Sequence, residues 1–299
     1  MPWKTIVIGG ECNVSLSNNR MRITRGDEYY NIPINDIETV FFTHQKCIIT
    51  IPIVSKLIEN NVNIVICNEK NDPIGVFNSF NSHSLVFKQL KTQINWKKPR
   101  KNKLWKKIIE EKIQSEIDVL KLTKPKVRNI ESLINYKNSV YSNDKTNQEA
   151  ASARIYFVSL FGVNFHRDDI SNIYNAALNY GYKLIASYIS RCIVSRGMIP
   201  QLGIHHIGES NAFNLSYDFI EPFRAIIDYW VFLNVKDCFG TIQKRKIIKI
   251  FDYKFNLNDR WMRLDDAIEI IIDSYIGFLN DKNEDISSID LSKGFLDED

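Results

Sequence analysis

The chain has 299 residues, 44% of them hydrophobic, which is enough for two domains with buried cores. No apolar run approaches the roughly 20 residues that cross a bilayer, and the first residues lack the charged and apolar regions of a signal peptide. The five cysteines are scattered without a Cys-x-x-Cys spacing, which argues against a zinc site and a disulfide framework. We therefore expect a cytoplasmic protein without a membrane partner.

The formal net charge of +4 is unevenly distributed along the chain. Residues 281–299 carry seven acidic residues and two lysines, a net charge of −5 that leaves +9 on residues 1–280. A body with this positive charge suits a polyanion such as DNA. The acidic segment 281–299 is polar enough to predict a mobile tail.

Residues 1–84 predict a small β domain. Short β-branched runs recur between turn signals, and Asn18-Asn19 between two of them indicates a tight hairpin turn. One small helix is expected at Pro52, because apolar residues there recur at helical spacing and proline suits a first helical turn. Strands this short and frequent favour sheet packed on sheet.

From about residue 85 the apolar period becomes helical. We expect a basic linker or helix over residues 85–103, an α-helical domain over residues 104–280 with its last helix at residues 261–279, and then the acidic tail. The predicted fold class is therefore α+β, an N-terminal β-sandwich-like domain followed by a larger all-α domain.

Two segments are candidates for DNA contact. Residues 96–107, WKKPRKNKLWKK, hold seven Lys/Arg and two Trp, which suits phosphate contact by the cations and stacking by the indoles. A second basic cluster surrounds Lys244 and Arg245. A solvated linker in the first case and plain solvent exposure in the second explain the same composition equally well.

Residues 203–224, GIHHIGESNAFNLSYDFIEPFR, hold the most informative pattern. His205 and His206 follow a turn, and Asp218 and Glu221 are three apart, which places both carboxylates on one face of a helix. Imidazole and carboxylate ligands suit Mg²⁺ or Mn²⁺. Pro222 should interrupt the helix just after Glu221. Loop histidines with a solvated helix face are the alternative interpretation.

Glu149 opens another predicted helix, in the phrase EAASARIYF over residues 149–157. Thr146 and Glu149 have the spacing of a capping box, in which Glu149 would only bond back to the start of the helix. The residues alone favour this capping role over metal ligation.

These two phrases closely resemble the signatures of the CRISPR-associated integrase, the "Cas-one" endonuclease family of spacer acquisition. The resemblance covers Gly203 with His206, the Asp218 to Arg224 helix, and Glu149 with Arg154, Tyr156 and Phe157. It is closest to the variants of type II CRISPR systems. It implies the fold expected above and favours Glu149 as a ligand over Glu149 as a cap.

By this resemblance, Glu149, His206 and Glu221 are the catalytic residues and ligands of Mg²⁺ or Mn²⁺. Asp218 matches an auxiliary acid, and His205 is the alternative imidazole. The candidate DNA-binding residues, from the basic segments and the motifs together, are Lys97, Lys98, Arg100, Lys101, Arg154, Arg224, Lys244 and Arg245.

The resemblance further implies a DNA endonuclease and integrase of CRISPR adaptation and antiviral defence. The 3′-hydroxyl of a short DNA fragment would attack a phosphodiester at the border of a repeat array. The implied partners are DNA, a second copy of the chain in a homodimer, a dimer of the small companion "Cas-two", and a type II effector with accessory adaptation proteins. The alternatives are a general metal-dependent nuclease and a non-catalytic DNA-binding assembly protein.

Overall fold

The computed structural model describes residues 4–69, 73–77, 85–123 and 127–296. Contacts divide the chain into two compact units. The first comprises Met1–Val86 with the short stretch Val194–Gly197, and the second comprises Phe87–Ile193 with Met198–Asp299. The border after Val86 lies close to the border predicted at residue 84.

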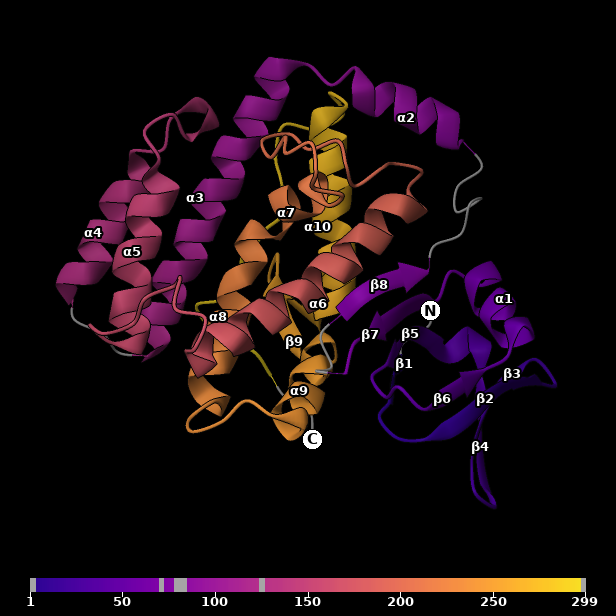
Figure 1. Ribbon diagram of the computed structural model, residues 1–299. Helices are drawn as coiled ribbons and strands as arrows, with labels where there is room; N and C mark the ends of the chain where they lie inside the picture. The colour runs from indigo at the N-terminus through magenta and orange to yellow at the C-terminus, as the bar shows by residue number, and fades with distance from the viewer. Residues whose placement is uncertain (1–3, 70–72, 78–84, 124–126, 297–299) are drawn as a thin grey trace. The chain divides into compact units, whose positions relative to one another are not determined.

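Two four-stranded sheets form the first unit (Figure 1). One has the order β1 (Lys4–Ile8), β5 (Ile37–Phe42), β7 (Asn63–Cys67) and β8 (Pro73–Phe77), with β8 alone antiparallel to its neighbour. The other has the order β4 (Glu28–Pro33), β3 (Arg20–Arg25), β2 (Cys12–Ser17) and β6 (Cys47–Ile49). A 3₁₀ turn, η1 (Ile34–Asp36), precedes β5.

One apolar core joins both sheets and helix α1 (Ile51–Glu59). Val14 of β2, Val40 of β5 and Leu57 of α1 all belong to it and are fully buried. Sheet packed on sheet with one small helix is therefore confirmed. The hairpin prediction is also confirmed, because Asn18 and Asn19 both have positive φ angles between β2 and β3, as a tight hairpin turn requires.

The second unit is mainly helical. Its elements in chain order are α2 (Val86–Ile94), α3 (Lys98–Thr123), α4 (Val127–Asn138), η2 (Ser142–Asp144), α5 (Gln148–Phe161), α6 (Ile173–Ser195), α7 (Asn214–Ile220), η3 (Glu221–Phe223), α8 (Arg224–Asn234), α9 (Thr241–Ile248), η4 (Lys249–Phe251), β9 (Lys254–Leu257), β10 (Arg260–Arg263), α10 (Leu264–Leu279) and β11 (Ile289–Asp290).

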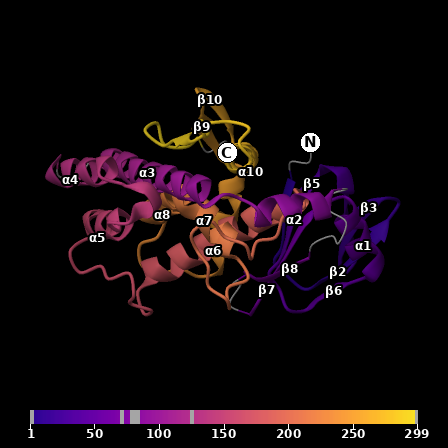
Figure 2. The same cartoon turned by 90° about the horizontal axis from the view of Figure 1, so that it is seen from above.

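Helix α3 is the central element of this unit, and it contacts α4, α5, η3, α8 and α10 (Figure 1). Its buried residues recur every three or four positions from Leu104 to Ile113, which keeps one face towards these neighbours, and from Ser115 to Leu120 every residue is buried. Three ionisable residues of α3 are buried, namely Lys112, Glu116 and Asp118. In the view from above, α7 and α8 lie between α6 and the β9–β10 hairpin (Figure 2).

The structure corrects the expectation of an all-α second domain. Strands β9 and β10 pair antiparallel through a turn at Asn258 and Asp259, both with positive φ. The final helix therefore begins at Leu264 rather than at residue 261, because Arg260–Arg263 is a strand. An asparagine–aspartate pair tolerates this left-handed turn, a signal that the helical interpretation overlooked.

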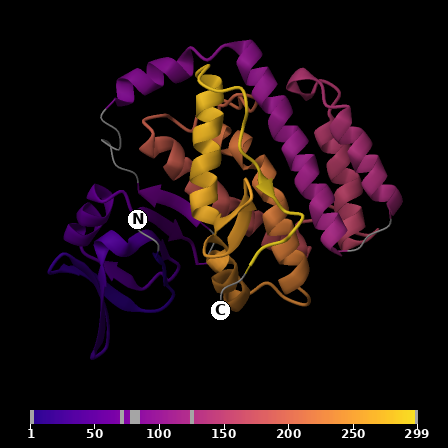
Figure 3. The same ribbon diagram turned by 180° about the vertical axis from the view of Figure 1, so that it is seen from behind.

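The acidic tail is also corrected. Strand β11 pairs with β9, Leu291 is buried, and Leu296 forms a bridge with Lys254. Figure 3 shows the yellow C-terminal segment running back along the second unit. Phe295 packs on the Tyr253 ring, with centroids 4.9 Å apart. Residues 281–296 therefore pack as part of the second unit, because their few apolar side chains, such as Leu291 and Phe295, are buried or stacked against it. Residues 297–299 lie outside the described ranges.

Residues 85–103, predicted as a basic linker or helix, form α2 and the start of α3. Trp96 is buried and donates a hydrogen bond from Nε1 to Asn280 Oδ1 at 2.8 Å, and Trp105 is fully buried. Neither indole is therefore placed to stack on DNA. Across the described part of the chain, no helix combines the length and the apolar character needed to cross a membrane.

Candidate metal centre

A cavity of about 250 Å³ in the second unit brings the three predicted ligands together. Residues from α3, α5, α6, η3, α8 and two loops form its wall. They are Lys112, Glu116, Glu149, Phe157, Arg167, Tyr182, His206, Glu221, Arg224, Ala225 and Asp228. Glu149, His206 and Glu221 are far apart in the sequence, so the helical packing around α3 is what assembles them.

Glu149 is not part of a capping box. The first N–H groups of α5, on Gln148 and Glu149, instead donate to the two carboxylate oxygens of Asp144 at 2.9 and 3.0 Å. Because Asp144 satisfies the helix start, the Glu149 side chain is released from that task. Its Oε1 accepts a hydrogen bond from Lys112 Nζ at 2.7 Å in the cavity.

His206 is held by Asp218. Its Nδ1 lies 2.8 Å from Asp218 Oδ1, and because a carboxylate only accepts, the Nδ1 proton is the donor. The free Nε2 lone pair is then the one available to a metal. This hydrogen bond raises the pKa of His206, while burial acts in the opposite direction.

Asp218 is fully buried and also fixes the loop that carries His206. Its oxygens accept from the backbone N–H groups of Ile204, His205 and His206 at 2.5, 3.2 and 2.9 Å. Gly203 is required beside it, since a Cβ there would stand 2.2 Å from the His206 carbonyl oxygen and 2.7 Å from Asp218 Oδ2. The auxiliary acid therefore orients an imidazole.

His205 points elsewhere. Its ring stacks on Trp105 with centroids 4.1 Å apart and an interplanar angle of 3°. Its Nδ1 lies 3.2 Å from Asn143 Oδ1. Of the two histidines, His206 is the one that lines the cavity.

Pro222 sets the position of Glu221. Helix α7 ends at Ile220 and the chain passes through η3 before α8 begins at Arg224, so the predicted interruption is present. Both Glu221 oxygens are engaged: Oε1 accepts from Arg224 Nε at 2.9 Å, and Oε2 accepts from Lys112 Nζ at 2.6 Å. Burial acts to raise the pKa of Glu221, but these two cations hold it at about 2.

Lys112 therefore bridges two predicted metal ligands with one ammonium group. Burial acts to lower the pKa of Lys112, but the charges of Glu221, Glu149 and Glu116 raise it above its ordinary value. The ammonium stays charged, and its position between the carboxylates is one that a cation favours.

The deep end of the cavity holds two further buried acids, Glu116 and Asp228. Burial raises the pKa of Glu116 to about 8 and that of Asp228 to about 6. Asp228 accepts a short hydrogen bond from the Tyr182 hydroxyl. Glu116 Oε2 has no hydrogen-bond partner.

Arg167 is the one guanidinium of the cavity wall that is held by neutral groups. It donates to Asn175 Oδ1 at 3.2 Å and to Asn179 Oδ1 at 2.6 Å. Its guanidinium carbon lies 5.5 Å from the centroid of the Tyr182 ring. Arg224, by contrast, is committed to Glu221.

The donor set fits a hard divalent cation, with two carboxylates and one imidazole. Within the described ranges, however, no three His, Cys, Asp or Glu side chains are grouped as a ready metal site. Lys112 stands between two of the three candidate ligands, because its ammonium pairs with one oxygen of Glu149 and one oxygen of Glu221. The arrangement is one in which a cation already neutralises the carboxylates.

Sequence reasoning missed Lys112, Glu116, Arg167, Tyr182 and Asp228. A signal for the first two was present, because Lys112 and Glu116 recur at helical spacing among the apolar residues of the segment that forms α3. An ionisable residue on such a stripe is rarely buried without a partner. No comparable signal marks Arg167, which lies in a loop.

The predicted DNA-binding residues have different environments. Arg100 contacts the C-terminal end of α10 and the segment after it, where it donates to the carbonyl oxygens of Phe278 and Asn283 and pairs with Glu284. Lys97 pairs with Asp281 at 3.3 Å. Lys98, Arg154 and Arg245 are exposed, and Lys244 lies 5.2 Å from the centroid of the Tyr180 ring.

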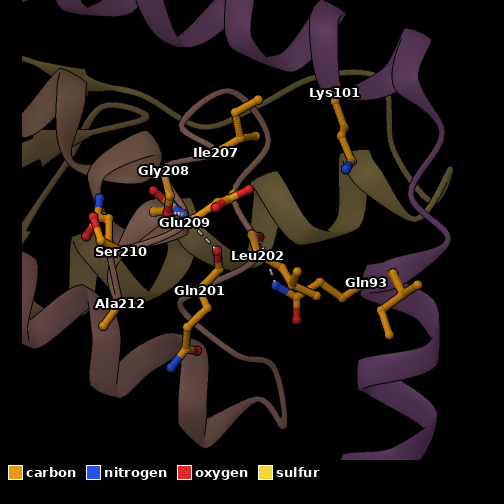
Figure 4. A pocket seen from close by; sticks show the side chains of 13 residues that line it. Gln93, Lys101, Gln201, Leu202, Ile207, Gly208, Glu209, Ser210 and Ala212 are labelled. Carbon is orange, nitrogen blue, oxygen red and sulfur yellow. Dashed lines mark hydrogen bonds between the residues drawn. The ribbon is translucent and has the colours of Figure 1, made fainter.

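Lys101 lines a second cavity, of about 530 Å³, on the other side of the loop that carries His206. Figure 4 shows Lys101 reaching from α3 towards this space, with Gln201 and the Ile207–Ala212 loop opposite. Gln93 closes one end by donating to the Ile199 and Leu202 carbonyl oxygens at 2.8 and 3.1 Å. Gln93 therefore holds the backbone just before the His206 loop, through contacts that lie outside the first cavity.

The two-unit fold is shared with DNA-integrating and CRISPR-associated proteins of known structure. A casposase bound to integration product matches 98% of this chain and 94% of its own with a TM-score of 0.74 at 19% identity. A Cas1 protein from Thermotoga maritima matches 92% of this chain and 97% of its own with a TM-score of 0.73 at 16% identity. The Cas6-RT-Cas1–Cas2 complex contains a chain that matches 93% of this one, over 35% of its own length, with a TM-score of 0.71 at 16% identity.

The chain belongs to the Cas1 family of CRISPR-associated proteins, whose pattern it matches over residues 5–244. It is 30% identical to a CRISPR-associated endonuclease Cas1 of Neisseria meningitidis over 290 residues, 95% of this chain and 94% of the relative. It is also 26% identical to a CRISPR-associated endonuclease Cas1 of Saccharolobus solfataricus over 227 residues, 72% of this chain and 70% of the relative. The family expected from residues 149–157 and 203–224 is thereby confirmed.

Proposed function

We propose that this Cas1 protein is a DNA endonuclease and integrase that inserts short DNA fragments into a CRISPR array. The observation that carries the proposal is the convergence of Glu149, His206 and Glu221 on one cavity, with Asp218 orienting the imidazole. The family and the likeness to a casposase bound to integration product support it.

The reaction proposed is a transesterification. The 3′-hydroxyl oxygen of the incoming fragment forms a bond to a phosphodiester phosphorus of the target strand. The bond from that phosphorus to its 3′ oxygen breaks, and the proton lost by the attacking hydroxyl is balanced by protonation of the leaving oxygen. Replacement of the attacking hydroxyl by water gives the endonuclease reaction. Phosphoryl transfer needs positioning and charge stabilisation more than a protein nucleophile.

Glu149, His206 through Nε2, and Glu221 would hold Mg²⁺ or Mn²⁺. A divalent ion there would supply charge stabilisation at the reacting phosphate and orient the attacking oxygen. The chain itself contributes Asp218, which fixes the imidazole tautomer, and Pro222, which ends α7 beside Glu221. Arg167 provides a cation on the cavity wall whose hydrogen bonds go to two amide oxygens, and we expect it to meet a DNA phosphate.

The partners proposed are DNA, a second copy of the chain and a Cas2 dimer, with type II effector and accessory adaptation proteins. The Cas6-RT-Cas1–Cas2 complex, in which one chain shares this fold, supports the Cas2 assignment. The net charge of +9 on residues 1–280 supports the DNA assignment.

A strand-transfer assay tests the proposal. The protein and its Cas2 companion are incubated with Mn²⁺ or Mg²⁺, a short duplex with 3′-hydroxyl ends, and a plasmid that carries a leader and repeat. Wild type should give joined product only when metal is present, and His206→Ala should give none while His205→Ala retains it. Loss with His205→Ala and not with His206→Ala would move the imidazole ligand to His205.

The assay also separates the alternatives. A general nuclease would nick the plasmid without joining the fragment. A non-catalytic assembly protein would bind the DNA, and its Glu149→Ala, His206→Ala and Glu221→Ala variants would behave like wild type. Either result contradicts the integrase function.

A further inference from the structure

Lys112 occupies the position that the metal-ligand assignment gives to a divalent ion. Its single ammonium nitrogen lies 2.7 Å from Glu149 Oε1 and 2.6 Å from Glu221 Oε2. The side chain is buried, and it projects from α3, whereas the two carboxylates come from α5 and η3. The ammonium therefore ties three elements together at the centre of the cavity.

Both oxygens of Glu221 already accept a hydrogen bond from a cationic side chain in this state. Its Oε1 accepts from Arg224 and its Oε2 from Lys112. Arg224 is the fixed partner of the two, because it is three residues away and its guanidinium carbon lies 4.6 Å from the centroid of the Tyr182 ring. Lysine carries a compact charge on a flexible stem, so Lys112 is the cation that can move.

Glu116 offers a place for the displaced ammonium. It lies four residues along α3 from Lys112, on the same buried face, where residues of a helix are neighbours. Glu116 Oε2 is buried and has no hydrogen-bond partner. A lysine that leaves Glu149 and Glu221 for Glu116 would donate a hydrogen bond to that unpaired oxygen.

We propose that Lys112 is a displaceable counterion, which holds Glu149 and Glu221 together while the site is free of metal and moves towards Glu116 when a divalent cation binds. The proposal rests on the metal dependence proposed above. Lys112 thus preserves the arrangement of the ligands without a bound ion, at the cost of competing with the ion for their oxygens.

The competition predicts opposite effects for two substitutions. Lys112→Met removes the competing charge and should tighten Mn²⁺ binding about tenfold or more, whereas Glu116→Gln removes the acceptor of the displaced ammonium and should weaken it. In the Lys112→Met background, Glu116→Gln should have little effect, because there is no ammonium left to receive. This non-additivity is the signature of two residues acting through one movement.

Mn²⁺ affinity is measured by isothermal titration calorimetry on the full chain, for wild type, both single variants and the double variant. The half-buried pair Lys106 and Glu110 provides the matched control, because it lies outside the cavity and has the same i, i+4 spacing on the same helix, with its charged atoms 3.5 Å apart. Lys106→Met, Glu110→Gln and their double variant should all bind Mn²⁺ with the affinity of wild type.

Thermal unfolding gives a second readout. Metal-free Lys112→Met should melt roughly 5 °C or more below wild type, and added Mn²⁺ should restore more stability to it than to wild type.

The results are decisive in each direction. Weaker or unchanged Mn²⁺ binding by Lys112→Met, with normal binding by wild type, overturns the counterion proposal and leaves the proposed function intact. No Mn²⁺ binding by wild type or by any variant overturns the metal dependence itself. If Lys112→Met does not fold, Lys112→Gln and the single Glu116→Gln variant make the same test, and unchanged affinity in Glu116→Gln contradicts the movement.

Discussion

The Asp218 carboxylate and the His206 imidazole are joined by a hydrogen bond of 2.8 Å between Oδ1 and Nδ1, and the carboxylate is fully buried beneath the loop. The same carboxylate accepts three backbone N–H groups of residues 204–206. Asp218 therefore determines both the direction of the ring and the shape of the loop that presents it.

Asp218→Asn should lower Mn²⁺ affinity by roughly ten- to a hundredfold, because the amide holds the imidazole less well and no longer fixes its tautomer. Asp218→Ala should in addition lower the free energy of unfolding by about 3 kcal/mol, because buried backbone donors lose their acceptor. Calorimetric titration and urea unfolding measure the two effects. Unchanged metal affinity in a folded Asp218→Asn protein would show that Asp218 only supports the loop.

Glu149 and Asp144 should separate into different roles on substitution. Glu149→Gln should abolish strand transfer with little loss of stability, because the start of α5 is satisfied by Asp144. Asp144→Ala should lower the free energy of unfolding by about 1 kcal/mol and retain strand transfer. The reverse pattern, with Glu149→Gln destabilised and active, would restore the capping role of Glu149.

Glu116 should make stability fall as the pH rises. Because its folded-state pKa is raised from 4.5 to about 8, the folded protein binds a proton that the unfolded chain has released. The stabilisation present below pH 4.5 is then lost progressively up to about pH 8. The free energy of unfolding of Glu116→Gln, relative to that of wild type, should therefore rise by on the order of 3 kcal/mol between pH 5 and pH 8. Urea unfolding at pH 5 and pH 8 measures this difference, with Glu110→Gln as the control. If the stabilities of wild type and Glu116→Gln changed in parallel with pH, the raised pKa would be contradicted.

Arg167 should contact a DNA phosphate. Arg167→Gln should weaken DNA binding and reduce the slope of log affinity against log salt by about 0.7–0.9, the value for one phosphate contact. Arg167→Lys should restore the slope but not the full rate of strand transfer, since lysine lacks the two-pronged geometry. Lys183→Gln, at an exposed position of α6 outside the cavity, is the control. An unchanged slope in Arg167→Gln would remove this contact from the proposal.

The basic segment 96–107 should also divide into two roles. Reversing the charge of Lys98 and Lys101 should flatten the salt dependence of DNA binding, whereas Arg100→Ala should chiefly lower the free energy of unfolding by about 2 kcal/mol, because Arg100 satisfies carbonyl oxygens at the end of α10. Filter binding across a salt series and urea unfolding distinguish them. Equal salt slopes in wild type and the Lys98, Lys101 variant would refute DNA contact by this segment.

The sequence by itself determined the family, the two-part α+β organisation and the identity of Glu149, His206 and Glu221 as the residues to examine. Local patterns suffice for these, because strand and helix periods, the Asn18-Asn19 turn and the break at Pro222 depend on neighbouring residues. The β9–β10 hairpin escaped prediction although its turn at Asn258 and Asp259 is a local signal. The docked tail escaped prediction because its pairing with β9 and Lys254 joins residues that are far apart in the sequence, and only packing selects it.

The tertiary structure alone decided which partners each of these side chains has. Glu149 was ambiguous until Asp144 was seen to satisfy the helix start, and His205 and His206 were distinguishable only by the rings and carboxylate that they contact. The bridge from Lys112 to Glu149 and Glu221 spans 37 and 109 residues of sequence. No local pattern encodes such a contact, because it depends on three helical elements packing around one buried charge.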